Sequence, residues 1–294
     1  MSDLARQLTQ LSATEMVAAL GATGAPALVR RGLALPFLAA SRPLGQKLAE
    51  LDTNIPERGL PEAARRALER FGVTLRVSGA ALEDGPQLVL ANHPGAYDAL
   101  SLMTALGRTD LLILAADRSF LRALPRLSEH LCWVGVDAAS RAGALRRAVS
   151  WLRAGGAVLH FPAGQIEPDA DFVADAQQLL GPWQPGVKTL VRACLRHGGQ
   201  LAVAGVRGVH SPRAKRLLIN RWAEQRGITT LSALLQIVGG LRDVVTRVHR
   251  QPLRLVAAPE SDSSIAELRQ QLSAAILRAS HGSTQRDGKG PPLK

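Results

Sequence analysis

Residues 92 to 98 read Asn-His-Pro-Gly-Ala-Tyr-Asp, so four residues separate a histidine from an aspartate. Histidine is the usual general base near neutral pH, and a neighbouring carboxylate fixes its tautomer and stabilises the imidazolium that forms when it takes a proton. His93 and Asp98 are therefore candidate catalytic residues. The alternative is structural: Asp98 would cap a helix that begins at Ala99, and His93 would make a hydrogen bond at a strand end.

Apolar runs position this pair and a second segment. Leu88–Ala91 has the pattern of a buried strand and Ala99–Leu106 that of a helix, so the pair lies in a strand-to-helix turn. Residues 157–164, Ala-Val-Leu-His-Phe-Pro-Ala-Gly, form another short apolar run that ends in a turn. Because open α/β sheets keep their sites at the carboxyl ends of strands, we expect both turns at one edge of a sheet. His160 precedes the second turn, and we expect it to be a hydrogen-bonded core residue.

Asn92-His93-x-x-x-x-Asp98, followed along the chain by Phe161-Pro162-x-Gly164, resembles the glycerolipid acyltransferase superfamily. Its members esterify glycerol phosphate or lysophospholipids. Two further blocks extend the resemblance over roughly residues 85 to 210: Gly135-Val136-Asp137 with Arg141, and Leu201–Val206. The resemblance implies an O-acyltransferase in which His93 deprotonates an acceptor hydroxyl, and the hydroxyl attacks the thioester of acyl-CoA or acyl-carrier protein without a covalent acyl-enzyme. Asp98 would hold and support the imidazole.

The resemblance also implies a set of substrate-binding residues: Asn92, Gly95, Arg141, Pro162, Gly164, Gln165 and Glu167. The main-chain N–H groups of Gly95 and Gly164 are candidates to stabilise the tetrahedral oxyanion. The side chains of Arg141, Gln165 and Glu167 are expected to contact the acceptor headgroup. The acyl donor is a co-substrate, and we expect neither a metal nor another cofactor.

The third block departs from the family pattern, which usually reads Phe-Pro-Glu-Gly-Thr-Arg. Ala163, Gln165 and Ile166 stand at the positions of the glutamate, the threonine and the arginine. In the second block, Ala138 replaces the arginine that usually follows the aspartate. Without an arginine fork a small phosphate loses a bidentate partner, so we expect a lysolipid-type acceptor to be preferred over glycerol 3-phosphate.

A second hypothesis, of a different class, is a non-catalytic protein that binds a membrane or an acyl carrier on the same fold. The altered third block favours it. The presence of both His93 and Asp98 favours the enzyme. No Gly-x-Ser-x-Gly, His-Glu-x-x-His, phosphate-loop or dinucleotide-binding motif supports another enzyme class.

From Val73 onward, short apolar runs alternate with longer periodic segments, which predicts an α/β fold with a mostly parallel sheet flanked by helices. The expected strands are Val73–Val77, Leu88–Ala91, Leu111–Ala115, Cys132–Val136, Ala157–Phe161, Leu201–Val206 and Leu253–Ala257. The expected helices are Ala99–Leu106, Ser119–Ser128, Arg141–Ala154, Pro185–Arg196, Ile228–His249 and Ser263–Arg278. The predicted organisation is an N-terminal helical accessory region at 1–70, an α/β acyltransferase domain at 71–260, and a C-terminal helix with a flexible tail at 261–294.

Several residues in the N-terminal region mark helix ends. The prolines at 36, 43 and 56 are expected to divide the region, and Ser12-x-x-Glu15 has the pattern of a capping box. Pro61 fits the first turn of a helix that Gly72 closes.

The chain has a formal net charge of +12, and residues 185–255 hold 13 Lys and Arg against 2 Asp and Glu. Such a block attracts anionic partners: a membrane surface, an acidic carrier protein or the phosphates of coenzyme A. Aromatic residues make up 3% of the chain, which argues against nucleic acid. There are two cysteines and no run of roughly twenty apolar residues. We therefore expect a cytoplasmic protein that associates peripherally with the inner face of the membrane.

Overall fold

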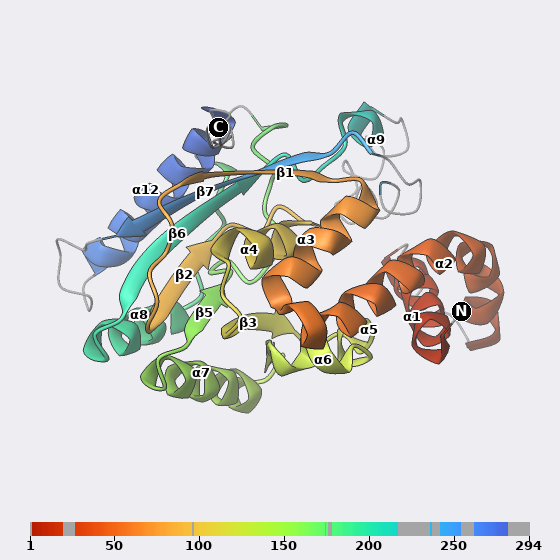
Figure 1. Ribbon diagram of the computed structural model, residues 1–294, viewed down its shortest axis with the longest axis horizontal. Coiled ribbons are helices and arrows are strands. Elements are labelled where there is room, and N and C mark those ends of the chain that lie inside the picture. The colour runs from red at the N-terminus through yellow and green to blue at the C-terminus, as the bar shows by residue number, and fades with distance from the viewer. Residues whose placement is uncertain are drawn as a thin grey trace, which may run out of the picture.

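The computed structural model describes residues 2–19, 27–95, 97–173, 175, 178–216, 236, 242–253 and 262–281. Within them lies a seven-stranded sheet of order β1-β7-β6-β2-β5-β3-β4 (Figure 1). The strands are β1 (Thr74–Gly79), β2 (Gln87–Ala91), β3 (Leu111–Ala116), β4 (Leu131–Val134), β5 (Ala157–His160), β6 (Gln200–Arg207) and β7 (Val245–Leu253). Neighbouring strands are parallel except β6 and β7, which confirms the predicted fold class.

The central strand β2 pairs in parallel with β5 on one side and β6 on the other. All five of its residues are buried, as expected of an apolar strand that is covered on both faces. Because the three strands run in the same direction, their carboxyl ends lie at one edge of the sheet. The segments that follow Ala91, His160 and Arg207 therefore meet there.

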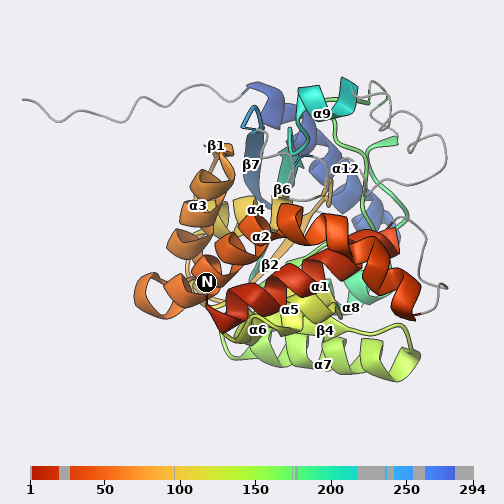
Figure 2. The ribbon, with the colours of Figure 1, turned by 90° about the vertical axis from the view of Figure 1, so that its right-hand side faces the viewer.

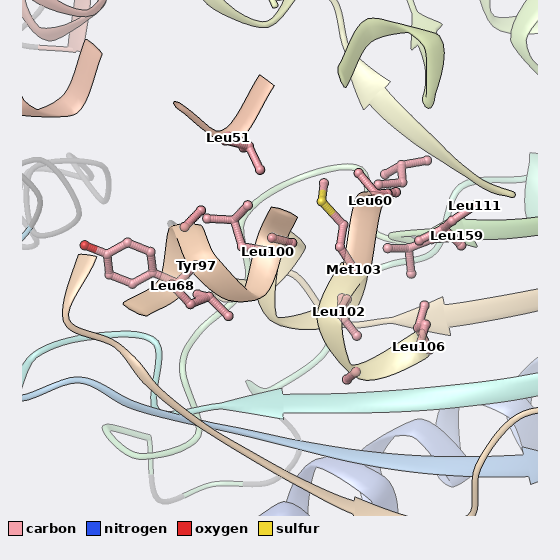
Figure 3. Close-up of a cluster of buried hydrophobic side chains, with 14 of the residues drawn as sticks. Leu51, Leu60, Leu68, Tyr97, Leu100, Leu102, Met103, Leu106, Leu111 and Leu159 are labelled. Atoms are coloured by element: carbon pink, nitrogen blue, oxygen red, sulfur yellow. The ribbon is translucent and has the colours of Figure 1, made fainter. Parts of the chain in front are cut away.

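Helices cover both faces of the sheet (Figure 1). One apolar core joins the sheet to α3 (Leu60–Phe71) and α4 (Asp98–Leu106), and Figure 3 shows part of it. A second core joins the other face to α7 (Ala138–Arg153), α8 (Gly186–Arg196) and α12 (Asp262–Arg278). The remaining short elements are α5 (Ser119–Arg122), α6 (Pro125–Glu129), α9 (Pro212–Arg216) and a 3₁₀ turn at Ala279–His281.

The N-terminal region contains α1 (Asp3–Ala19) and α2 (Ala27–Arg58), which pack along each other (Figure 2). The three prolines do not divide α2, which continues through all of them because its packing against α1 and α3 outweighs the lost helical hydrogen bonds. The predicted capping box is also wrong, since Ser12 and Glu15 lie inside α1. Pro61 does lie in the first turn of α3, and Gly72 ends that helix with φ 74°.

The region after β6 corrects two other predictions. Most of the helix expected at Ile228–His249 lies outside the described residues, but the prediction is wrong from residue 242 onward. Residues 242–244 are not helical, and from Val245 the chain forms β7, which inserts between β1 and β6. The strand expected at Leu253–Ala257 overlaps β7 only at its first residue, and residues 254–257 lie outside the described ones. The helix expected at Ser119–Ser128 forms as the two short helices α5 and α6. Residues 282–294, which include most of the predicted tail, also lie outside the described part of the chain.

Candidate active site

The imidazole of His93 and the carboxylate of Asp98 are in direct contact. His93 Nδ1 lies 2.7 Å from Asp98 Oδ2. A carboxylate can only accept, so Nδ1 carries the hydrogen and the Nε2 of the neutral ring keeps a free lone pair. The Asp98 side chain is 2% exposed and that of His93 is 32% exposed. The pair therefore has a buried acid and a base that substrate can approach.

Two opposing effects set the pKa of His93. Burial of the ring lowers this pKa, whereas the charge and hydrogen bond of Asp98 and the charge of Glu167 raise it. The raising effects prevail, so the pKa of His93 lies above its usual value. The site is thus built to stabilise an imidazolium, which is the form His93 takes after it accepts a proton.

Asp98 does not act as the predicted helix cap. It is the first residue of α4, the preceding Tyr97 makes no side-chain cap, and Asp98 Oδ2 instead accepts the Gly95 N–H at 2.8 Å. Gly95 has φ 130°, a conformation that glycine adopts readily and other residues rarely do. The Gly95 N–H is therefore bonded to Asp98 and is not free for an oxyanion.

The turn after β5 contacts His93 directly. The Phe161 ring lies 4.6 Å from the His93 ring, centroid to centroid. In the same turn, Gly164 has φ 65°, and its N–H donates to the Phe161 carbonyl at 3.0 Å. That N–H is likewise engaged, so the oxyanion role expected of Gly95 and Gly164 is not supported by this arrangement. The two sequence blocks do meet at one edge of the sheet, as predicted.

Glu167 is bound to the main chain rather than facing a headgroup. Its side chain is buried, and the carboxylate accepts the His93 N–H at 3.0 Å and the Gly181 N–H at 2.8 Å. The Glu167 N–H in turn donates to the His93 carbonyl at 2.8 Å. Burial raises the pKa of Glu167, and these hydrogen bonds oppose the rise. The expected contact between Glu167 and an acceptor is therefore corrected to a contact with the main chain of His93.

The other residues of the third block surround Gly181. A Cβ placed on Gly181 would lie 3.1 Å from Gln165 Nε2, 3.4 Å from the Ala163 Cβ and 3.8 Å from Glu167 Oε1. Ala163 is buried here, whereas Gln165 is exposed. Pro162 is buried and its carbonyl accepts the Gln184 N–H at 2.8 Å. Of this block, Gln165 keeps a side chain that a substrate can reach.

Asn92 and Arg141 also differ from their predicted contacts. Asn92 is fully buried and its amide exchanges two hydrogen bonds with the main chain of Val206, at 2.8 and 2.7 Å, which tie β2 to β6. Arg141 is exposed and donates to the Val136 carbonyl at 2.8 Å. It follows β4, three strand positions from β2, or roughly 14 Å at the usual strand spacing. Neither side chain lies against the His93–Asp98 pair.

Sequence reasoning missed His210, which follows the carboxyl end of β6. Its ring is buried, and Nε2 donates to the Pro94 carbonyl at 3.0 Å. A Cβ placed on Gly95 would lie 3.5 Å from His210 Cε1, so the ring packs against the turn at residues 93–95. The available signal was its position: a histidine shortly after the end of an apolar strand, as His93 is.

His160 belongs to the core, but the hydrogen bond expected for its ring is not found in the described part of the chain. It alternates with Leu159, which faces α3 and α4, so its ring lies on the α7 and α8 side of the sheet. Neither ring nitrogen has a partner among the described residues. Burial lowers the pKa of His160 to about 4. The ring is therefore neutral at physiological pH.

Residues 73–206 match the family model described as Acyltransferase. Within the α/β domain, the matched segment is similar to acyltransferase domains. Its matched range includes the His93–Asp98 pair and the Phe161–Pro162 turn, and this confirms the resemblance found in the sequence. His210 lies just beyond the matched range.

Among solved structures, the chain is similar to the 1-acyl-sn-glycerophosphate (LPA) acyltransferase PlsC from Thermotoga maritima. The two are 15% identical, with a TM-score of 0.46 over 96% of this chain and 100% of that one. No curated protein matches the chain. None of the helices that the structure describes is long and apolar enough to cross a membrane.

Proposed function

We propose that the protein transfers a fatty acyl group from acyl-CoA or acyl-carrier protein to the hydroxyl of a lysolipid-type acceptor. The observation that supports this most directly is the bond of 2.7 Å between His93 Nδ1 and Asp98, which leaves Nε2 as the basic nitrogen. The acyltransferase family supplies the reaction type. The donor, the acceptor class and the role of His93 as general base are proposed.

In the proposed reaction, His93 Nε2 takes the proton of the acceptor hydroxyl while the hydroxyl oxygen attacks the thioester carbonyl carbon. The resulting tetrahedral intermediate expels the thiolate as the new ester forms. The imidazolium returns its proton to the thiolate sulfur, so His93 is neutral again at the end of the cycle. Asp98 orients the ring and stabilises its charged form throughout. No covalent acyl-enzyme is needed.

The loop that follows the Phe-Pro turn supports a lysolipid acceptor. Ile166, at the position of the family arginine, is 41% exposed, and Phe172 in the same loop is 40% exposed. Two exposed apolar side chains near the site are suited to contact with an acyl chain. Burying such a chain contributes about 0.8 kcal/mol per methylene, which would offset the absent arginine fork.

The basic segment, residues 185–255, supports binding to an anionic membrane surface. It thereby also supports a cytoplasmic location, with the protein bound to the inner face of the membrane. Part of its charge is neutralised locally: Arg207 and Arg247 both pair with Asp171, and Arg213 lies 3.7 Å from Asp243. The segment holds 13 Lys and Arg against 2 Asp and Glu, so it keeps a net positive charge that would attract an anionic membrane.

The proposal is tested by incubating the purified protein with radiolabelled acyl-CoA or acyl-carrier protein and a panel of lysolipids. General-base catalysis contributes roughly 10²- to 10⁴-fold, so we expect His93→Ala to lose transfer by that factor. His130→Ala is the matched control, because the His130 ring is also hydrogen-bonded, to the Leu111 carbonyl at 3.2 Å, but His130 precedes a strand at the opposite edge of the sheet. Wild-type turnover in His93→Ala would refute the assignment. A protein that binds donor and vesicles but transfers nothing would favour the non-catalytic alternative.

A further inference from the structure

Every polar main-chain group of the turn at residues 93–95 is hydrogen-bonded. Pro94 has no N–H, so the turn offers two donors and three acceptors. Asp98 satisfies two of them, accepting from the Gly95 N–H at 2.8 Å and donating its own N–H to the Gly95 carbonyl at 3.0 Å. The other three are satisfied by Glu167 and His210, which lie far away in the sequence.

We propose that Glu167 and His210 are positioning residues, which hold the main chain of the His93–Gly95 turn so that the His93 ring meets both Asp98 and the substrate hydroxyl. This inference rests on the proposed function, because it assigns a role in the same reaction. Neither residue belongs to the four-residue-spaced His-Asp motif.

Glu167 holds the first residue of the turn by both of its main-chain groups. The His93 N–H donates to Glu167 Oε2 at 3.0 Å, and the His93 carbonyl accepts the Glu167 N–H at 2.8 Å. The other carboxylate oxygen accepts the Gly181 N–H at 2.8 Å. Two acceptor atoms are needed at this point, which a carboxylate provides and an amide does not.

His210 holds the second residue. Its ring is buried, and Nε2 donates to the carbonyl of Pro94, which is buried as well. Burial lowers the pKa of His210, and the opposing attraction of Asp169 and Asp98 does not reverse this, so the ring stays neutral and keeps one N–H to donate. Removing the ring would leave the Pro94 carbonyl buried without a partner.

The main chain that carries the His210 ring is itself held by hydrogen bonds to Asp169. The Asp169 carboxylate accepts three consecutive main-chain N–H groups, those of Gly208, Val209 and His210, at 2.8, 2.8 and 3.1 Å. The loop after β6 is thereby tied to the loop after β5. Both external supports of the catalytic turn come from loops that follow the two strands paired with β2.

The expected effect is on turnover rather than donor affinity. His93 contacts the reacting atoms, and a misplacement of about 1 Å costs on the order of 10²-fold in rate. A loosened turn would also weaken the His93–Asp98 bond, and Glu167 contributes charge of its own to His93. We therefore expect a lower pKa of His93 when either support is removed.

The experiment uses the full chain and compares Glu167→Gln, His210→Ala and His210→Gln with wild type. Glutamine at 210 keeps an N–H at the position of Nε2, whereas alanine does not. Glutamine at 167 turns an N–H₂ group toward one of two main-chain donors. We expect kcat to fall roughly 10- to 100-fold in Glu167→Gln and His210→Ala with an unchanged donor KM, and to recover within a few-fold in His210→Gln. Titration of the His93 ring by NMR should give a lower pKa in the two damaged variants.

Two controls separate positioning from loss of stability. Asp52 is a buried carboxylate whose Oδ1 accepts two main-chain N–H groups, those of Arg126 and Leu127, each at 2.9 Å, and Asp52→Ala, which removes both bonds, is the comparison for Glu167→Gln. His130→Ala is the match for His210→Ala. Both controls should lower thermal stability without changing kcat or the pKa of His93.

An unchanged kcat and His93 pKa in folded His210→Ala and Glu167→Gln would overturn the proposal. So would a His210→Gln protein as impaired as His210→Ala, because the hydrogen bond would then not be the cause. If wild type acylates no acceptor, the proposed function fails, but the NMR titration still decides whether the two residues control His93. If one variant does not fold, the other still provides the test.

Discussion

Replacement of His160 by leucine should stabilise the protein, and increasingly so as the pH falls. The ring is 9% exposed on β5, and neither nitrogen has a partner among the described residues. A buried polar group without a hydrogen bond costs about 1–3 kcal/mol, so an apolar side chain of similar volume should raise the free energy of unfolding already at pH 7.5.

The pH dependence follows from the lowered pKa. Burial lowers the pKa of folded His160 from 6.5 to about 4. As the pH falls through this interval the unfolded chain takes up a proton on His160 and the folded chain does not, so wild type loses stability that the leucine variant keeps. At 1.36 kcal/mol per pKa unit, the advantage of leucine should grow by about 3 kcal/mol between pH 7.5 and pH 4.

The measurement is urea-induced unfolding of wild type and His160→Leu at both pH values, with His130→Leu as a control for removing a histidine from the unfolded chain. Comparison at each pH cancels the titration of all other groups. An advantage that is equal at pH 7.5 and pH 4 would refute the reasoning, because the ring would then titrate alike in both states. Loss of transfer in a folded leucine variant would show instead that His160 takes part in the reaction.

Three other predictions concern the reaction and its partners. Asp98→Asn keeps an acceptor oxygen but removes the charge that stabilises the imidazolium. Losing about 2–4 kcal/mol of this stabilisation should lower kcat roughly 30- to 1,000-fold and leave the donor KM nearly unchanged. A wild-type kcat in this variant would contradict the prediction. Ile166→Arg should raise kcat/KM for glycerol 3-phosphate by roughly 10-fold or more, because it restores a charged hydrogen bond. Ala163→Glu should not raise it, because this substitution buries a second carboxylate beside Glu167. A wild-type protein that prefers glycerol 3-phosphate to every lysolipid would refute the acceptor assignment. The protein should bind anionic vesicles and release them as salt rises, since each cation near the surface contributes about 1 kcal/mol that salt screens; equal co-sedimentation with neutral vesicles would rule this out.

The sequence predicted that His93 and Asp98 lie in one turn at the carboxyl edge of the sheet because both features depend on local patterns. Leu88–Ala91 and Ala157–His160 are short apolar runs followed by turn residues, and such runs form buried parallel strands with little ambiguity. The parts that failed depend on distant packing. The course of α2 through Pro43 and Pro56 is set by its neighbours rather than by its own residues.

The partners of the polar side chains were the least predictable part of the site. Glu167 and Asn92 have residue types that suit a substrate contact, and only the fold shows that both bind main-chain groups instead. β7 was obscured for a related reason. In the sequence, Pro252 argues against a strand because proline has no N–H to donate. In the structure, the pairing of β7 with β1 ends at Arg250, so Pro252 lies beyond it and no hydrogen bond to β1 is lost.

Glu167 and His210 come much later in the chain than the turn at residues 93–95 that they hold. Their positions determine when this turn can reach its final conformation during protein synthesis. When α4 has just emerged from the ribosome, the nascent chain outside the ribosome contains His93 and Asp98 but neither Glu167 nor His210. It also lacks β5 and β6, the two strands that flank β2. Domains fold as units once their sequence has emerged. If Glu167 and His210 position His93 as proposed, the His93–Asp98 pair is fixed in place only after the segment through His210 has been translated, and incomplete chains that end before it should not catalyse transfer.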